Sequence, residues 1–141
     1  MLSGMTRPHV RAAHRALLLI VIGFSLGFLV QLVIERDASE RVQAIIGCAT
    51  TQDPIECARP LVRTLLQEHT ASQVVDALSL ASNSQSQCHY FSHIVGQEAY
   101  MKYRSTERAL AECSRACGVA CIHGAIGQSF VAETGLQEEE A

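Results

Sequence analysis

The chain has 141 residues, of which 48% are hydrophobic, and its formal net charge at pH 7 is −3. This length suits one domain with a short additional segment and excludes two full domains. The acidic balance argues against nucleic acid as a partner, because binding to phosphates requires a basic surface.

A continuous hydrophobic run covers residues 16–34 and holds no charged side chain. As a helix it would be roughly 28 Å long, which matches the hydrocarbon thickness of a bilayer. A cleavable signal peptide is the alternative, but its apolar region normally has only about 7 to 15 residues. We therefore predict a transmembrane signal-anchor helix within the lipid bilayer, and cleavage stays open as the alternative.

The charges that flank this run predict its orientation. Residues 1–15 carry three arginines and no acid, whereas residues 35–141 hold 8 Lys and Arg against 14 Asp and Glu, a net charge of −6. Basic flanks remain in the cytoplasm. The sequence thus predicts a single-pass membrane protein with a cytoplasmic N-terminus and a periplasmic or extracellular C-terminal domain.

Within the run, Gly23 and Gly27 form a G-x-x-x-G pair. Two glycines one helical turn apart let another helix approach closely, so this face is a candidate for homodimerisation or for contact with another membrane protein. Glycine is also common in membrane helices without such a role.

Beyond the run, helical periodicity and capping signals recur, and alternating strand patterns with hairpin turns are absent. We predict an all-α fold: one N-terminal transmembrane helix, a small disulfide-stapled helical domain over residues 35–135, and an acidic tail at 136–141. Asp37 and Glu40 are a cap pair for a first short helix that ends near residue 50.

Two further helix starts precede a polar linker. Asp53, directly before a proline, caps the first of these helices, and Pro60 should kink or restart it. Thr70 and Gln73 form a capping box for the second. Residues 82–87 are polar throughout and are predicted to form a loop.

Three helices are predicted after this linker. They cover residues 88–100, about 105–117 and about 119–134, with Gly118 able to bend or stop the chain between the last two. The periodicity of the last helix turns Phe130 inward.

A faint echo relates residues 93–97 to residues 123–128. Both segments contain a histidine, a glycine and a glutamine, at spacings that differ by one residue. We interpret the echo as two helices that meet the same packing requirement, and not as a repeat.

All six cysteines lie beyond the hydrophobic run, where an oxidising compartment would make them useful as disulfides. They are Cys48, Cys57, Cys88, Cys113, Cys117 and Cys121. Cys48 and Cys57 bracket a turn between two helices, so we predict that they pair. The other four allow three pairings, which the sequence leaves open. Each bond could add roughly 2 to 4 kcal/mol of stability.

The histidines are the second group of candidate functional residues, after the cysteines. His89 and His93 are four residues apart, so they share a helical stripe that also contains Gly96 and Tyr100. His123 comes from another helix, and the three imidazoles could converge. Such a set can bind zinc or copper, or hold a haem non-covalently. Gly96 would leave room for a ligand or for a closely packed backbone.

Other interpretations of these residues stay open. Half-buried histidines can simply bond to carbonyl groups or to each other, and H-x-x-x-H is a weak motif by itself. Thiolates of Cys88 or Cys121 would be further ligands only if they stayed reduced. Covalent c-type haem requires C-x-x-C-H and zinc protease chemistry requires H-E-x-x-H, and the sequence contains neither. Glu98 could orient an imidazole or act as a base, but an enzyme is the less favoured hypothesis.

Two functions are therefore predicted. The first is a membrane-tethered helical module, stapled by disulfides, that acts in binding or in the assembly of a membrane complex. The alternative is a metal- or haem-binding domain, with a possible redox or enzymatic role, that uses His89, His93 and His123.

Overall fold

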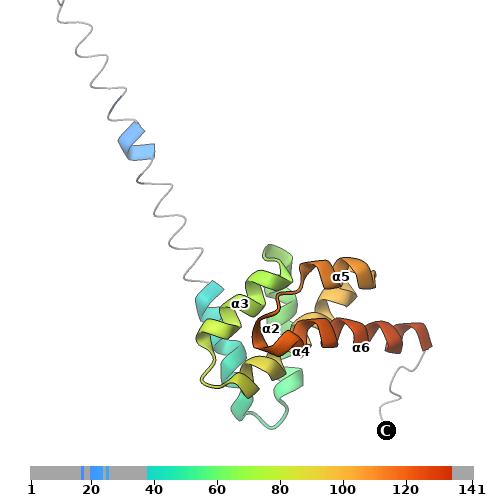
Figure 1. Cartoon of the computed structure of the whole chain (residues 1–141). Helices are drawn as coiled ribbons and strands as arrows, with labels where there is room; N and C mark the ends of the chain where they lie inside the picture. The colour runs from blue at the N-terminus through green and yellow to red at the C-terminus, as the bar shows by residue number, and fades with distance from the viewer. Residues whose placement is uncertain (1–16, 18–19, 24, 26–37, 135–141) are drawn as a thin grey trace, which may run out of the picture. The chain divides into compact units, whose positions relative to one another are not determined.

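The computed structural model describes Leu17, Ile20–Gly23, Ser25 and residues 38–134 (Figure 1). The chain divides into two units, Met1–Asp37 and Ala38–Ala141. Residues 38–134 form helices and the turns between them, with no strand. The prediction of an all-α, disulfide-containing domain is confirmed.

In the first unit, the described residues are helical. Four large apolar side chains there are exposed: Leu17, Ile20, Val21 and Ile22. Most of the predicted transmembrane run 16–34, including Gly27, lies outside the described residues, as do residues 1–15 and 136–141. In the described part of the chain, no helix combines the length and the apolar character needed to cross a bilayer.

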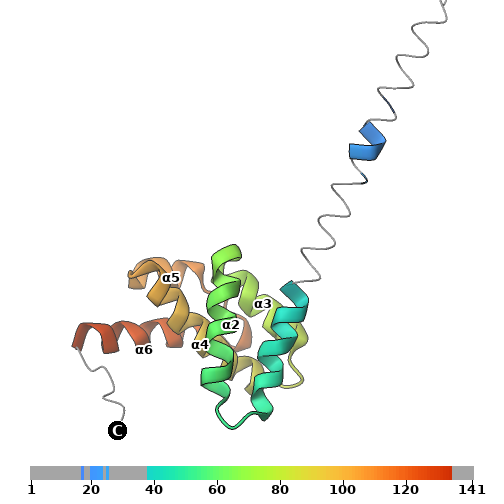
Figure 2. The same cartoon turned by 180° about the vertical axis from the view of Figure 1, so that it is seen from behind.

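The second unit begins with a helical hairpin. Residues 38–47 are helical and lie antiparallel to α2 (Pro54–Glu68), as Figure 2 shows from behind. The short 3-10 helix η1 (Cys48–Thr50) begins the turn between them. A disulfide joins Cys48 to Cys57 across this turn, with Cα atoms 5.6 Å apart, so the predicted pairing of these two residues is confirmed.

Side-chain caps fix where the next helices start. The carboxylate of Asp53 accepts hydrogen bonds from two backbone N–H groups in the first turn of α2, at 3.1 and 3.0 Å. In α3 (Ala71–Ala81), Thr70 and Gln73 form the predicted capping box. Both starts agree with the sequence prediction, because a cap is a local interaction that needs no tertiary contact.

Of the predicted kink or restart at Pro60, the restart is wrong, because α2 is continuous through this residue. Core residues on both sides of the proline belong to one buried face: Ala58, Val62, Leu65 and Leu66. Burial of that face on both sides of Pro60 keeps the chain helical there, although proline removes one backbone hydrogen bond.

The central helix is α4 (Gln85–Tyr103), which contacts α2, α3, α5 and α6. It starts three residues earlier than predicted, inside the expected loop. The reason is a local cap: Ser84 Oγ accepts a hydrogen bond from the N–H of Gln87 at 3.2 Å. Phe91, Val95 and Ala99 are fully buried along one face of the helix.

After α4 come α5 (Thr106–Glu112), η2 (Ala116–Val119) and α6 (Ala120–Thr134). The predicted helix up to residue 117 is wrong beyond 112, because the chain becomes extended at Cys113. A disulfide explains why. Cys113 and Cys121 would be about 12 Å apart on one continuous helix, whereas their Cα atoms lie 5.6 Å apart and their sulfurs are bonded.

The remaining two cysteines, Cys88 and Cys117, are also paired, with Cα atoms 5.3 Å apart. Of the three pairings that the sequence left open, the structure therefore has 88 with 117 and 113 with 121. No free cysteine remains among the six, all of which lie within the described range 38–134.

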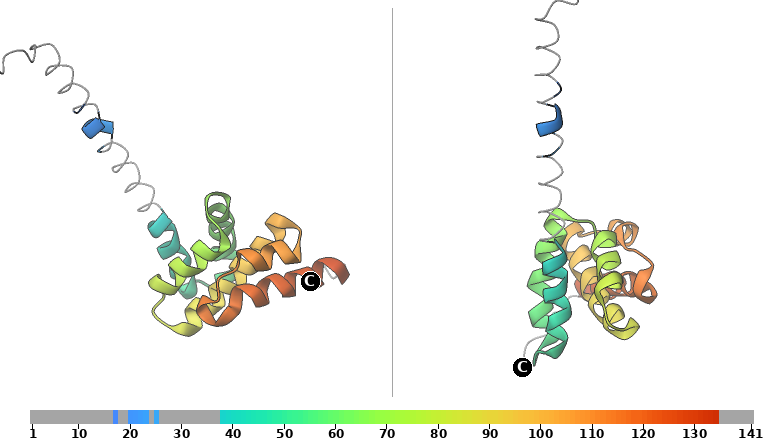
Figure 3. Two further views of the ribbon diagram at one scale, coloured as in Figure 1. Left: turned by 45° about the horizontal axis from the view of Figure 1, so that its top comes forward. Right: turned by 90° about the vertical axis from the view of Figure 1, so that its left-hand side faces the viewer.

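α4 and α6 make the most extensive helix contact in the domain (Figure 3). A Cβ atom built at Gly96 would collide with the carbonyl oxygen of Cys121, and one built at Gly124 would collide with the carbonyl oxygen of His93. The two backbones thus touch at two glycines. This contact buries small residues of α6, and Phe130 lies 61% exposed, contrary to the sequence prediction.

Candidate metal centre

Three histidines converge at the crossing of α4 and α6. His89 and His93 lie one turn apart on α4, and their Nε2 atoms are 3.1 Å apart. His123 lies in the second turn of α6 and its ring centre is 5.9 Å from that of His93. One nitrogen of each imidazole lies within 4.8 Å of the other two. The structure brings together all three residues that the sequence proposed as metal ligands.

The glycines at the helix crossing bring His123 to this place. Gly96 leaves no cavity beside the histidines, because the backbone of α6 fills the space that its missing side chain vacates. Gly124 directly follows His123 and packs against the backbone of His93. Of the two roles that the sequence allowed for Gly96, the structure shows close backbone packing.

A backbone carbonyl orients His89. Its Nδ1 atom lies 2.9 Å from the carbonyl oxygen of Cys117. Because a carbonyl oxygen only accepts hydrogen bonds, Nδ1 carries the hydrogen, and Nε2 of the neutral ring presents its lone pair. In this arrangement the lone pair of His89 accepts a hydrogen bond from Nε2–H of His93, 3.1 Å away. Metal-bound histidines typically use this arrangement, with the second ring nitrogen donating to a carbonyl or a carboxylate.

The carbonyl of Cys117 comes from an unusual turn. Cys117, Gly118 and Val119 all have left-handed backbone angles, with φ of 55°, 68° and 58°. A β-branched residue such as Val119 adopts this conformation only when its surroundings enforce it. Gly118 lies against the imidazole of His89: a Cβ built there would be 3.2 Å from Nδ1. From the sequence, Gly118 was predicted only to bend or stop the chain.

The electrostatic surroundings favour a neutral His93. Burial lowers the pKa of His93 below its ordinary value, and the adjacent His89 and His123 lower it further. A histidine must be neutral to bind a metal ion. A neutral His93 can bind an ion at Nε2 once its hydrogen shifts to Nδ1, and no charged ring has to lose a proton.

This pKa shift predicts that the metal-free protein loses stability when the pH falls below about 6.5, the ordinary value for histidine. In that range the unfolded chain binds a proton at His93 and the folded chain does not. The loss should continue down to the lowered pKa of the folded state. Thermal unfolding between pH 7.5 and 5 in the presence of a chelator measures the effect.

The matched variant for this measurement is His93→Gln, which removes the titrating group. Its stability should depend less steeply on pH between 6.5 and the lowered pKa than that of the wild type. Identical slopes for the two proteins would show that His93 does not contribute.

The donor set and its spacing fit a zinc-type ion. Two ligands of one tetrahedral zinc ion with bonds near 2.0–2.1 Å are roughly 3.3 Å apart, and His89 and His93 Nε2 are 3.1 Å apart. His123 is exposed, so its side chain is free to complete the set by rotation. Cysteine thiolates are not available, because all six cysteines are in disulfides.

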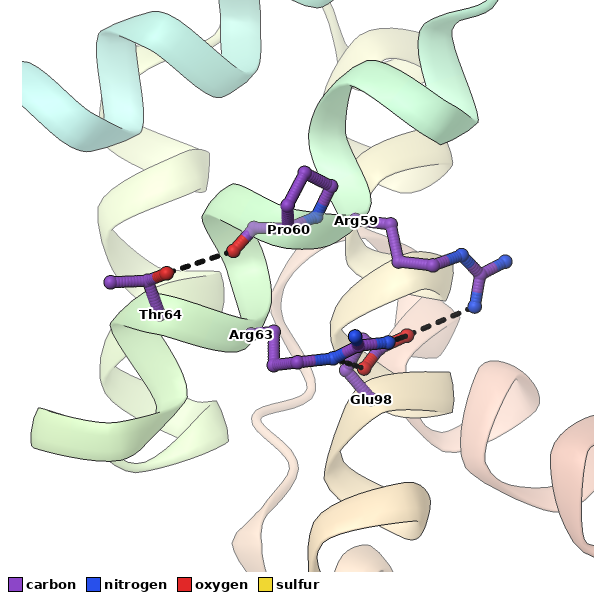
Figure 4. Close-up of polar contacts among 5 residues, drawn as sticks. All are labelled: Arg59, Pro60, Arg63, Thr64 and Glu98. Carbon is purple, nitrogen blue, oxygen red and sulfur yellow. Dashed lines mark hydrogen bonds and ion pairs between the residues drawn. The ribbon is translucent and has the colours of Figure 1, made fainter.

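The structure does not bring Glu98 or Tyr100 to the histidines. Glu98 is 2% exposed and its carboxylate binds Arg59 at 2.9 Å and Arg63 at 3.0 Å, both on α2 (Figure 4). Tyr100 is buried in the hydrophobic core. Glu98 therefore ties α4 to α2, and it neither orients an imidazole nor serves as a base at this site.

Comparison with known proteins gives no match: no family model, no curated protein and no solved structure is similar to this chain.

Proposed function

We propose that this protein is a metal-binding domain that takes one divalent ion of the zinc and copper class at His89, His93 and His123. The convergence of three imidazoles from two helices, within 4.8 Å of one another, is the observation that carries the proposal. Zinc and copper(II) both favour imidazole nitrogen ligands. Three protein ligands would leave a fourth position open to water or to an external ligand.

Two features support metal binding over a purely structural role for the histidines. The Cys117 carbonyl holds the Nδ1–H form of His89, so that Nε2 is available as a ligand. The lowered pKa of His93 keeps that ring neutral. A haem held between His89 and His93 is disfavoured, because the direct contact of the two imidazoles leaves no space for a macrocycle between them.

The first test is titration of Zn²⁺ and Cu²⁺ into the purified full-length chain by calorimetry. The variant His123→Ala should bind at least about 100-fold more weakly, because the exposed side chain supplies a ligand and no core packing. His69→Ala is the control, since His69 lies at the C-terminal cap of α2, outside the cluster. Absence of Zn²⁺ and Cu²⁺ binding by the wild type, or equal affinity in both variants, would refute the metal proposal.

We also propose that the domain is tethered to a membrane and exported. Supporting features are the uncharged run 16–34, its arginine-rich flank, and the exposed apolar side chains of its described helical residues. Three disulfides fit an oxidising compartment. Gly23 and Gly27 would let two such tethers pair.

The tether predicts that the full chain stays in the membrane fraction after an alkaline carbonate wash. A second chain that begins at residue 35, expressed for export in the same way, should appear in the soluble fraction. Release of the full chain by the wash would contradict the anchor.

A further inference from the structure

The left-handed turn at Cys117, Gly118 and Val119 needs an external constraint. Three consecutive residues with positive φ are costly, since two of them carry side chains that disfavour this region. Disulfides fix the chain at the first residue of the turn and just after the turn. Cys117 is bonded to Cys88 on α4, and Cys121, two residues after the turn, is bonded to Cys113.

The Cys88–Cys117 bond also completes a closed loop of bonds that includes His89. Cys88 immediately precedes His89 on α4, and the carbonyl of Cys117 accepts the Nδ1 hydrogen of His89 at 2.9 Å. This closed loop runs from His89 along the backbone to Cys88 and across the two sulfurs to Cys117. It returns to the imidazole of His89 through the hydrogen bond. Gly118 packs on the same imidazole. One covalent bond thus sets both the position and the hydrogen-bonding state of a proposed metal ligand.

We propose that the Cys88–Cys117 disulfide positions His89 for metal binding, so that the site is completed only on the oxidised chain. The inference rests on the proposed metal-binding function. Without the bond, the turn relaxes toward ordinary backbone angles and the Cys117 carbonyl leaves Nδ1. His89 then exchanges between its two neutral forms, and in one of them Nε2 carries the hydrogen and cannot bind the ion.

The chemistry of assembly is a thiol–disulfide exchange. The thiols of Cys88 and Cys117 lose two protons and two electrons, and an external disulfide such as oxidised glutathione accepts them and becomes two thiols. A dithiol reductant drives the reverse step. Metal loading would therefore follow oxidation of the chain, and an unoxidised chain would hold the ion weakly.

The test compares two disulfide variants of the full-length chain, Cys88→Ala/Cys117→Ala and Cys48→Ala/Cys57→Ala. Alanine is preferred to serine because it buries no hydroxyl group. Both cysteines of a pair are replaced because a remaining free thiol would itself bind zinc. We expect the first variant to bind Zn²⁺ at least about 10-fold more weakly than the wild type, as loss of an outer-shell partner typically does. The second variant lacks a bond in the distant α2 hairpin and should bind within about threefold of the wild type.

A second measurement reports which nitrogen of the His89 imidazole carries the hydrogen. Nitrogen NMR of the metal-free protein should show His89 in the Nδ1–H form in the wild type and in Cys48→Ala/Cys57→Ala, and a mixture of forms in Cys88→Ala/Cys117→Ala. A lower free energy of unfolding by itself would not change the ratio of the two neutral forms of His89 in the folded protein. This readout needs no metal, so it tests the positioning role even if the wild type binds none.

A third variant covers the case in which Cys88→Ala/Cys117→Ala does not fold. Gly118→Ala keeps every disulfide but adds a Cβ at a left-handed position next to His89, and it should weaken Zn²⁺ binding about 10-fold and mix the two ring forms. Equal affinity in the two disulfide variants, or an unchanged Nδ1–H form in the first disulfide variant or in Gly118→Ala, would overturn the proposal.

Discussion

Replacement of Gly96 by alanine is expected to destabilise the domain by about 3 kcal/mol, at the upper end of the cost of overpacking. The added methyl group would collide with the backbone carbonyl of Cys121 on α6. A flexible side chain could move aside, but a backbone group inside a helix cannot do so without displacing that helix. The two helices must separate, and His123 must move away from His93. Urea unfolding of the purified protein measures the loss.

The matched control is Gly127→Ala on α6. A Cβ built at Gly127 meets nothing within 4 Å, and the residue is exposed. Alanine there should stabilise the helix by about 0.5 to 1 kcal/mol, because it has the higher helix propensity. Similar small effects at both positions would show that α4 and α6 do not touch as described.

The second large effect is expected for the double variant Arg59→Ala/Arg63→Ala. Both guanidinium groups bind the carboxylate of Glu98, which is 2% exposed (Figure 4). Removal of both partners leaves a buried charge without compensation, which typically costs about 3 to 5 kcal/mol. Arg63 alone should matter less, because its side chain is 62% exposed and Arg59 would remain bound. Chemical unfolding at pH 7 provides the measurement.

A triple variant separates charge from packing in this experiment. Glu98→Gln, added to the double variant, removes the buried charge and keeps the shape of the side chain. Part of the lost stability should return. If the triple variant is as unstable as the double variant or less stable, the cost comes from lost arginine packing and not from the unpaired carboxylate.

Local signals predicted the parts of this fold that depend on neighbouring residues. The caps at Asp53 and Thr70 and the Cys48–Cys57 bond all join residues fewer than ten positions apart. The stripe of His89 and His93 follows from helical periodicity alone. Such interactions are encoded in short segments, so the sequence predicts them without knowledge of the tertiary structure.

The errors occur where a tertiary contact or an undetermined disulfide pairing decides the local structure. Cys113 and Cys121 are eight positions apart, but the sequence left the partner of each open, and their bond ends the predicted helix early. Phe130 points outward because the glycine contact buries the opposite, small-residue face of α6. Gly124 and the Cys117 carbonyl were missed as parts of the site. The similarity between the two histidine segments pairs Gly96 with Gly127, which is exposed, and so did not point to Gly124.

The Cys48–Cys57 and Cys88–Cys117 disulfides differ in how much of the fold must form before their sulfurs can meet. Cys48 and Cys57 are nine positions apart and need only the turn of a hairpin, whereas Cys88 and Cys117 are 29 apart and meet only where the end of the chain returns to α4. Closing the longer loop costs more chain entropy. We therefore expect the histidine cluster to form late in folding, after the central helix has packed against its partners from both halves of the sequence.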